Sequence, residues 1–187
     1  MAVRAMQNKC RRRRQRGITL IEISMVLALT AIFIAGVFAY LRTATTNQKV
    51  EQAVGEVAFM RNTVYELYSS QPSFGSLNPT QLAASNVVPR RMVDAAGTGL
   101  RHAFKGRMDV QPTQVSYFGD SFSIELDQLP SDGCILMAAK DFGRDVYRID
   151  ITGGAGGSFT SVLGPSQAQA ACGTTGETAA SITWYFR

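Results

Sequence analysis

Apolar residues form one unbroken run near the start of the chain, from Ile18 to Leu41. The run is 24 residues long and contains one charged side chain, Glu22. Its hydroxyl-bearing residues can hydrogen-bond to the backbone of a helix. As a helix rising 1.5 Å per residue it would be about 36 Å long, which exceeds the roughly 30 Å of a bilayer core. The run is therefore predicted to span a membrane.

A second apolar pattern follows and continues the helix. It is one stripe with spacings of three and four, made of Val50, Val54, Val57, Met60, Val64 and Leu67. The polar residues of this stretch, Glu56 among them, fall largely off the stripe. Since no proline occurs before Pro72, one helix is predicted from about Thr19 to about Ser70. Its first half is apolar all round and its second half is amphipathic.

From Gln71 onward the pattern is that of a small α+β domain. Asn78 followed by Pro79 is typical of a helix N-terminus and predicts a short helix. Apolar and polar residues then alternate, which predicts half-buried antiparallel strands at 121–127, 147–151 and 182–186.

Two further segments lie between these strands. Residues 130–141 are predicted to form a helix capped by Ser131 or Asp132, with a core face at 135–138. The glycine-rich stretch 153–157 is expected to be a flexible loop. It is not expected to bind phosphate, because no Walker lysine follows it.

The positive charge of the chain is concentrated at its start. The formal net charge is +5, and residues 1–17 contain seven Lys and Arg and no acid. The rest therefore keeps 12 of the 19 basic residues against all 14 acidic ones, so no nucleic-acid partner is expected. A basic segment directly before an apolar span indicates a cytoplasmic N-terminus and a C-terminal domain on the other side of the membrane.

Cysteine and histidine residues limit the chemistry that the chain can perform. Cys10 lies in the basic segment, and without that segment Cys134 and Cys172 remain as an even pair, which suits an oxidising compartment. The one histidine, His102, is expected in a loop or on the surface. With one histidine and no CxxC spacing, we expect no metal site, no cofactor and no enzyme activity.

The segment RGITLIEISMVLALTAIF, from Arg16 to Phe33, resembles the signature of type IV pilins. The resemblance implies that a prepilin peptidase cuts after Gly17 and that Ile18 becomes the N-methylated first residue of the mature chain. It also makes Glu22 the fifth mature residue, the position at which the family has glutamate.

The physical chemistry of the segment agrees with this resemblance. A carboxylate at the centre of a membrane helix costs on the order of 2.5–3.5 kcal/mol and is normally retained for a function. Cleavage after Gly17 would create an α-amine at Ile18, which is a natural partner for Glu22. The two lie four residues apart in one helix, but Glu22 could instead reach the amine of a neighbouring helix. The family implies the second arrangement, in which the pair sets the register of a filament.

The resemblance covers most of the chain. It implies the pilin fold, in which a long N-terminal helix packs on an antiparallel sheet, with a C-terminal disulfide between Cys134 and Cys172. The division it implies is a cleaved leader at 1–17, a filament-core helix at 18–41, an amphipathic helix at 42–70 and a head at 71–187. The 17-residue leader, the isoleucine at position 18 and the segment from Pro130 to Cys134 are similar to the type IVb branch.

The resemblance implies a structural function. The expected partners are other copies of the chain, the prepilin peptidase, the inner-membrane assembly machinery and, before assembly, the lipid bilayer. The precursor is expected in the inner membrane and the assembled subunit in an extracellular pilus for adhesion, aggregation, conjugation or motility. The alternatives are a type II secretion pseudopilin, a minor pilin, or a membrane-anchored periplasmic binding domain that does not polymerise.

Overall fold

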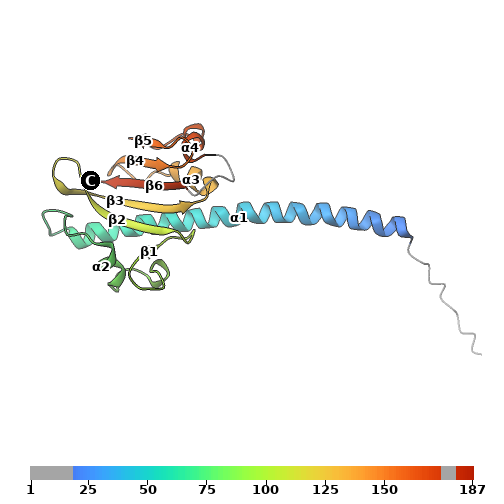
Figure 1. The fold of residues 1–187 in the computed structure, drawn as a ribbon, viewed down its shortest axis with the longest axis horizontal. Coiled ribbons are helices and arrows are strands. Elements are labelled where there is room, and N and C mark those ends of the chain that lie inside the picture. Colours follow the sequence, from blue (N-terminus) through green and yellow to red (C-terminus); the bar gives the residue numbers. More distant parts are fainter. Residues whose placement is uncertain (1–18, 174–179) are drawn as a thin grey trace, which may run out of the picture. The chain divides into compact units, whose positions relative to one another are not determined.

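The computed structural model describes residues 19–173 and 180–187, and the expected leader and the Gly17–Ile18 junction lie outside this range. The chain divides into two compact units, Met1–Arg42 and Thr43–Arg187. Helix α1, Leu20–Tyr68, belongs to both units, and its bounds confirm the single long helix predicted from the sequence (Figure 1). It is the one helix of the described residues that is long and apolar enough to span a membrane.

The second unit is a head domain built on an antiparallel sheet. Its six described strands lie in the order β1-β2-β3-β6-β4-β5, with these bounds: β1 Leu100–Arg101, β2 Arg107–Gln114, β3 Phe118–Leu129, β4 Val146–Thr152, β5 Gly157–Phe159 and β6 Ala180–Phe186. The strands predicted at 121–127, 147–151 and 182–186 are thus confirmed as β3, β4 and β6. The C-terminal strand β6 lies between β3 and β4, so the end of the chain completes the sheet.

Short helices flank the sheet: α2 Pro79–Ala84, η1 Arg90–Met92, α3 Ser131–Ala138 and α4 Pro165–Cys172. The Asn78 side chain caps α2 by accepting a hydrogen bond from the Thr80 amide at 2.9 Å, as its sequence predicts. Helix α3 is also confirmed, but its cap is different from the predicted one. Pro130 is the N-cap residue and no side chain caps the helix, so the expectation for Ser131 or Asp132 is wrong. Proline fixes the extended backbone that leads into α3.

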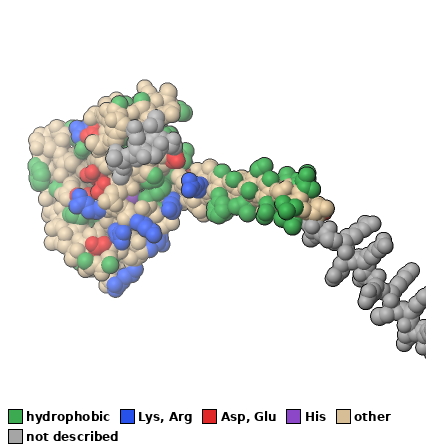
Figure 2. Space-filling view, turned by 45° about the vertical axis from the view of Figure 1, so that its right-hand side comes forward, with side chains coloured by type: hydrophobic (Ala, Val, Ile, Leu, Met, Phe, Trp, Pro, Cys, Tyr) green, Lys and Arg blue, Asp and Glu red, His purple; other side chains and the backbone are tan. Residues whose placement is uncertain are grey.

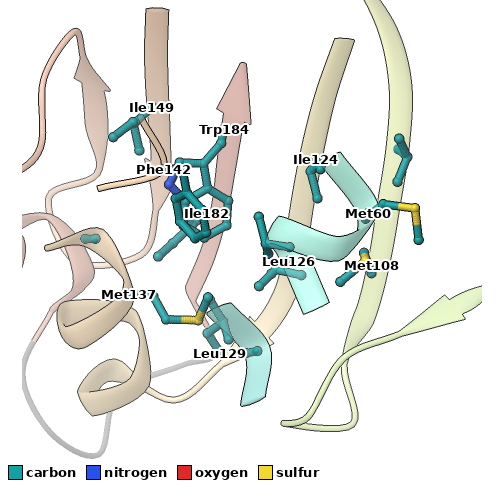
Figure 3. Packing of buried hydrophobic residues seen from close by; sticks show 14 of the residues in the cluster. Met60, Met108, Ile124, Leu126, Leu129, Met137, Phe142, Ile149, Ile182 and Trp184 are labelled. Atoms are coloured by element: carbon teal, nitrogen blue, oxygen red, sulfur yellow. The ribbon is translucent and has the colours of Figure 1, made fainter. Parts of the chain in front are cut away.

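The core forms between the amphipathic half of α1 and the inner face of the sheet. Met60 of α1 lies near Met108 of β2 and Ile124 of β3, and Trp184 of β6 packs edge-on against Phe142 at 5.1 Å (Figure 3). The buried face of α1 consists of Val50, Ala53, Glu56, Val57, Met60, Thr63 and Val64. Of the predicted stripe, Val54 is only partly buried and Leu67 is 42% exposed. The buried residue that follows Val50 on this face is Ala53, three positions along the helix, and not Val54, four positions along.

His102 lies in the turn between β1 and β2, so its expected loop position is confirmed, but its side chain is not on the surface. His102 is buried, where its ring bonds to the Asp127 carbonyl oxygen at 2.7 Å and accepts from the Phe104 amide at 3.3 Å. Burial lowers the pKa of this imidazole. The glycine-rich stretch is a loop from Gly153 to Gly156, as expected, and β5 begins at Gly157. This loop packs on α4, because Ala155 and Gly156 donate backbone hydrogen bonds to the carbonyls of Ala170 and Ala171. A side chain on Gly154 would lie 2.3 Å from the Gly173 nitrogen, so glycine is needed there for close approach.

Candidate assembly site

The first half of α1 exposes apolar side chains at positions all around the helix, and Figure 2 shows one face of this apolar surface. Fourteen large apolar residues between 20 and 41 are exposed: Leu20, Ile21, Ile23, Met25, Val26, Leu27, Leu29, Ile32, Phe33, Ile34, Val37, Phe38, Tyr40 and Leu41. A continuous apolar surface of this extent marks an interaction with a membrane or with other protein surfaces. The segment is therefore built to be covered by something outside its own chain.

The need to hydrogen-bond every peptide group explains why this segment is a helix. A helix pairs its peptide groups within itself, which an apolar environment requires. The hydroxyl groups follow the same rule, because Ser24 Oγ donates to the Ile21 carbonyl at 2.8 Å and Thr30 Oγ1 donates to the Val26 carbonyl at 2.6 Å. The hydroxyls of Ser24 and Thr30 therefore bond to the helix backbone as predicted, whereas the third hydroxyl residue of the run, Thr19, lies before the first residue of α1.

Glu22 lies in the first turn of α1 and is exposed. Its amide donates to the Thr19 carbonyl at 3.1 Å, so its backbone is already helical. Within the described residues its carboxylate forms no ion pair. Its expected partner, the Ile18 amine, lies outside those residues together with Gly17. A carboxylate near the positive end of a helix, surrounded by apolar side chains, is suited to bind one cation.

The amphipathic half of α1 contains a second acid that the periodicity assigned to solvent. Glu56 is only 3% exposed, and both of its carboxylate oxygens accept hydrogen bonds. Oε1 accepts from Gln52 Nε2 at 2.9 Å, and Oε2 accepts from the Ala103 amide at 2.8 Å. Glu56 thus ties α1 to the turn between β1 and β2. In the structure Glu56 lies three residues after Ala53, on the buried face of α1.

The disulfide connects the two short helices beside the sheet. Cys134 of α3 and Cys172 of α4 are bonded across a Cα–Cα distance of 5.8 Å, as expected from the sequence. Both side chains are buried. The two cysteines are 38 residues apart in the sequence, and the loop that their bond closes contains β4 and β5. It thereby holds α3 to the segment that leads into β6.

A rigid turn between β2 and β3 was not predicted. The Asp120 carboxylate accepts backbone hydrogen bonds from Val115 at 2.8 Å, Ser116 at 2.6 Å and Tyr117 at 3.1 Å. These donors stabilise the charged form, so the pKa of Asp120 falls to about 2 although its burial opposes the fall. The turn presents Phe118 to solvent with 61% of its surface exposed. In the sequence, the feature that could have indicated this turn is Asp120 directly after Gly119.

Comparison with known proteins identifies relatives over both units. The family described as Bundlin matches residues 42–187, and the prokaryotic N-terminal methylation motif matches residues 12–38. The major structural subunit of bundle-forming pilus from Escherichia coli O127:H6 (strain E2348/69 / EPEC) is 30% identical over 142 residues, which are 74% of this chain and 72% of that protein. The same subunit from Escherichia coli O111:H- is 29% identical over 161 residues, 86% of this chain and 82% of that protein.

Solved structures share the fold at lower sequence identity. TcpA, a type IV pilin from Vibrio cholerae El Tor biotype, superposes with a TM-score of 0.53 at 15% identity and covers 75% of this chain and 99% of its own. The type IVb pilin from Salmonella typhi superposes with a TM-score of 0.54 at 16% identity and covers 74% of this chain and 97% of its own. The arrangement of helix, sheet and disulfide is therefore that of a pilin.

Proposed function

The chain belongs to the bundlin family of type IV pilins, and on that basis we propose that it is the major subunit of a bundle-forming type IV pilus. Members of this family are structural subunits and not enzymes, and pilin subunits polymerise into a pilus. The two relatives from Escherichia coli are major subunits of bundle-forming pilus, which favours that assignment over a minor pilin or a secretion pseudopilin.

The proposal includes processing of the precursor in the inner membrane. A prepilin peptidase cleaves after Gly17, and Ile18 then carries the N-methylated amine. The match of residues 12–38 to the N-terminal methylation motif supports this. The seven basic residues of the leader keep the N-terminus in the cytoplasm, so the head lies in the periplasm. The disulfide between Cys134 and Cys172 is consistent with that oxidising compartment. The pilus assembly machinery then transfers the subunit from the bilayer to the filament.

One observation carries the proposal: Glu22 is the single acid in an exposed apolar segment that is long enough to span a bilayer. In the precursor the bilayer covers that segment. In the filament the same segments of other copies cover it. Glu22 of one copy then pairs with the Ile18 amine of a neighbour, which fixes the axial stagger between them. A membrane anchor that never polymerises has no use for this carboxylate.

The test is Glu22→Gln in the full chain. Glutamine has nearly the same size and a similar helix propensity, so insertion and cleavage should be unchanged. It cannot neutralise the Ile18 amine, and an unpaired charge in an apolar core costs about 3–5 kcal/mol. We therefore expect the yield of sheared filaments, relative to cleaved pilin in the membrane, to fall by about tenfold or more.

The control is Thr30→Val, which removes one hydroxyl that bonds only to the helix backbone at Val26. This variant should be cleaved and should assemble like the unchanged chain. Intact-mass analysis of its filaments should give a chain that begins at Ile18 with one added methyl group. Normal filament yield from cleaved Glu22→Gln would refute the registration role and favour the non-polymerising anchor.

A further inference from the structure

Three exposed cations lie in and beside the turn between β1 and β2: Arg101 at the end of β1, Lys105 in the turn and Arg107 at the start of β2. Lys49 of α1 belongs to the same group, because its ammonium lies 6.0 Å from the centre of the Phe104 ring in that turn. These four residues are called the basic cluster here. Figure 2 shows several Lys and Arg side chains on the visible face of the head, with Asp and Glu side chains among them. The head as a whole has no excess of positive charge, so the cluster is local.

Two features of the basic cluster lower the stability of the fold. Arg101 lies directly opposite Arg107 in the ladder between β1 and β2, and like charges in that position repel each other. Lys105 has a φ of 70°, a backbone conformation that side chains with a Cβ rarely adopt. Glycine would relieve this strain and a neutral residue would relieve the repulsion. Costs of this kind at a defined site suggest a function for the charges.

The turn is also held in a fixed geometry. The Arg101 guanidinium donates to the Lys105 carbonyl at 2.9 Å, and the buried Glu56 carboxylate accepts from the Ala103 amide at 2.8 Å. Among the described residues Arg107 forms one ion pair, with Asp109 at 3.8 Å, and its side chain stays 67% exposed. The cations are therefore pre-positioned and largely not neutralised, as a site for an anionic ligand requires.

The position of the turn along α1 points to the ligand. The turn contacts α1 at Lys49 and Glu56, near the start of the amphipathic half. Lys49 follows Leu41, the end of the apolar run, by eight residues, which is about 12 Å of helix. On the proposed function, the apolar run lies in the bilayer before assembly. The basic cluster then belongs to the end of the head that is nearest, along the chain, to the lipid headgroups.

We propose that the basic cluster binds the phosphate groups of anionic phospholipids while the precursor waits in the membrane. Each Lys or Arg near an anionic surface adds to such binding, and the effect is lost at high salt. The contact holds the head against the bilayer surface until the subunit is extracted. This inference rests on the proposed function, because it requires the chain to be inserted in a membrane.

The test compares lysine acetylation in nanodiscs that hold one copy of the full chain. One set contains phosphatidylcholine alone, and the other also contains about one third phosphatidylglycerol. We expect Lys105 to react about fivefold more slowly in the anionic nanodiscs, and about 0.5 M NaCl to remove the difference. Lys140, which pairs with Glu51 at 2.7 Å, should react equally in both.

Matched variants decide whether the cluster is responsible. Arg101→Gln with Arg107→Gln should abolish the protection of Lys105, whereas Arg144→Gln with Arg187→Gln removes the same charge elsewhere and should leave it intact. Equal reactivity of Lys105 in the two lipids would overturn the inference while leaving the pilin function in place. Protection that persists in phosphatidylcholine or at high salt would also overturn it. A chain that enters neither nanodisc would contradict the proposed membrane-anchored precursor itself.

Discussion

At the scale of single residues, Asp120 determines the geometry of the β2–β3 turn. Its two carboxylate oxygens accept three backbone amides, and an asparagine offers only one acceptor oxygen. In Asp120→Asn we expect faster hydrogen exchange at the amides of Val115, Ser116 and Tyr117, and a lower Tm. Glu125→Gln is the control, because it removes the same charge from the same strand and, within the described residues, Glu125 accepts no backbone hydrogen bond. Unchanged exchange in Asp120→Asn would contradict this role.

The same carboxylate gives the turn a pH dependence with a defined sign. Because the pKa of Asp120 falls from 3.8 to about 2 in the folded state, the unfolded chain binds the proton more tightly. The contribution of Asp120 to stability is therefore complete above about pH 3.8 and is lost as the pH falls toward 2. The difference in Tm between Asp120→Asn and the unchanged chain should shrink over that interval.

Gly106 occupies a position where no side chain would fit. A Cβ at this position would lie 2.0 Å from the Asp127 carbonyl oxygen and 2.5 Å from His102 Nε2. Gly106→Ala is therefore expected to lower the free energy of unfolding by about 2–3 kcal/mol. Guanidinium unfolding of the detergent-solubilised chain, followed by the fluorescence of Trp184, measures the change.

The matched control for Gly106 is Gly55 in α1, where an added Cβ would meet nothing within 4 Å. Gly55→Ala should raise the free energy of unfolding by about 0.5–1 kcal/mol, because alanine loses less backbone entropy in a helix. If both substitutions changed stability in the same direction, the crowding assigned to Gly106 would be wrong.

At the scale of elements, the disulfide links α3 to α4, and its contribution to the free energy of unfolding can be measured. Closing a loop with a separation of 38 residues stabilises a fold by about 4 kcal/mol in the chain-entropy model. The double variant Cys134→Ser, Cys172→Ser should lose about that amount in denaturant unfolding. A loss well below this value would mean that the packing of α3 and α4 is sufficient without the bond.

Periodicity predicted the elements that are long and half-buried, and it missed those without a strong pattern. Helix α1 and strands β3, β4 and β6 have apolar positions at a clear spacing. Strand β1 has two residues and β5 has three, too few for a period to appear. Strand β2 contains Pro112, which argues against a strand unless it lies at an edge. Helix α4 buries only Ala168, Ala171 and Cys172, so its small side chains gave no apolar stripe.

Sequence patterns were limited in the same way for the functional and buried polar residues. Glu22 is marked in the sequence as a single acid in an apolar run, and its role in assembly stays a prediction. The burial of Glu56 and His102 could not be predicted, because it depends on partners distant in sequence, at Ala103 and Asp127 respectively. A polar residue on an amphipathic helix is assigned to solvent unless such a partner is known. The buried polar contacts that stabilise the head could therefore be identified only from the folded structure.

At the scale of the whole molecule, the exposed apolar surface and the buried core come from different parts of the chain. Every buried apolar core residue lies at Val50 or beyond among the described residues. Large apolar residues between 20 and 41 are all exposed. Within the described residues, the first unit therefore presents an exposed apolar surface, and the second unit contains the buried core.

This division predicts that residues 43–187 fold without the apolar segment. Expressed in an oxidising compartment, this fragment should be a soluble monomer in size-exclusion chromatography, since it keeps the whole core and the bond between Cys134 and Cys172. Trp184, the one tryptophan of the chain, is fully buried and should give the same blue-shifted emission as in the full chain. The fragment should form no filaments, because it lacks Glu22 and the apolar surface. Aggregation, or emission typical of an exposed tryptophan, would mean that the head needs the first unit in order to fold.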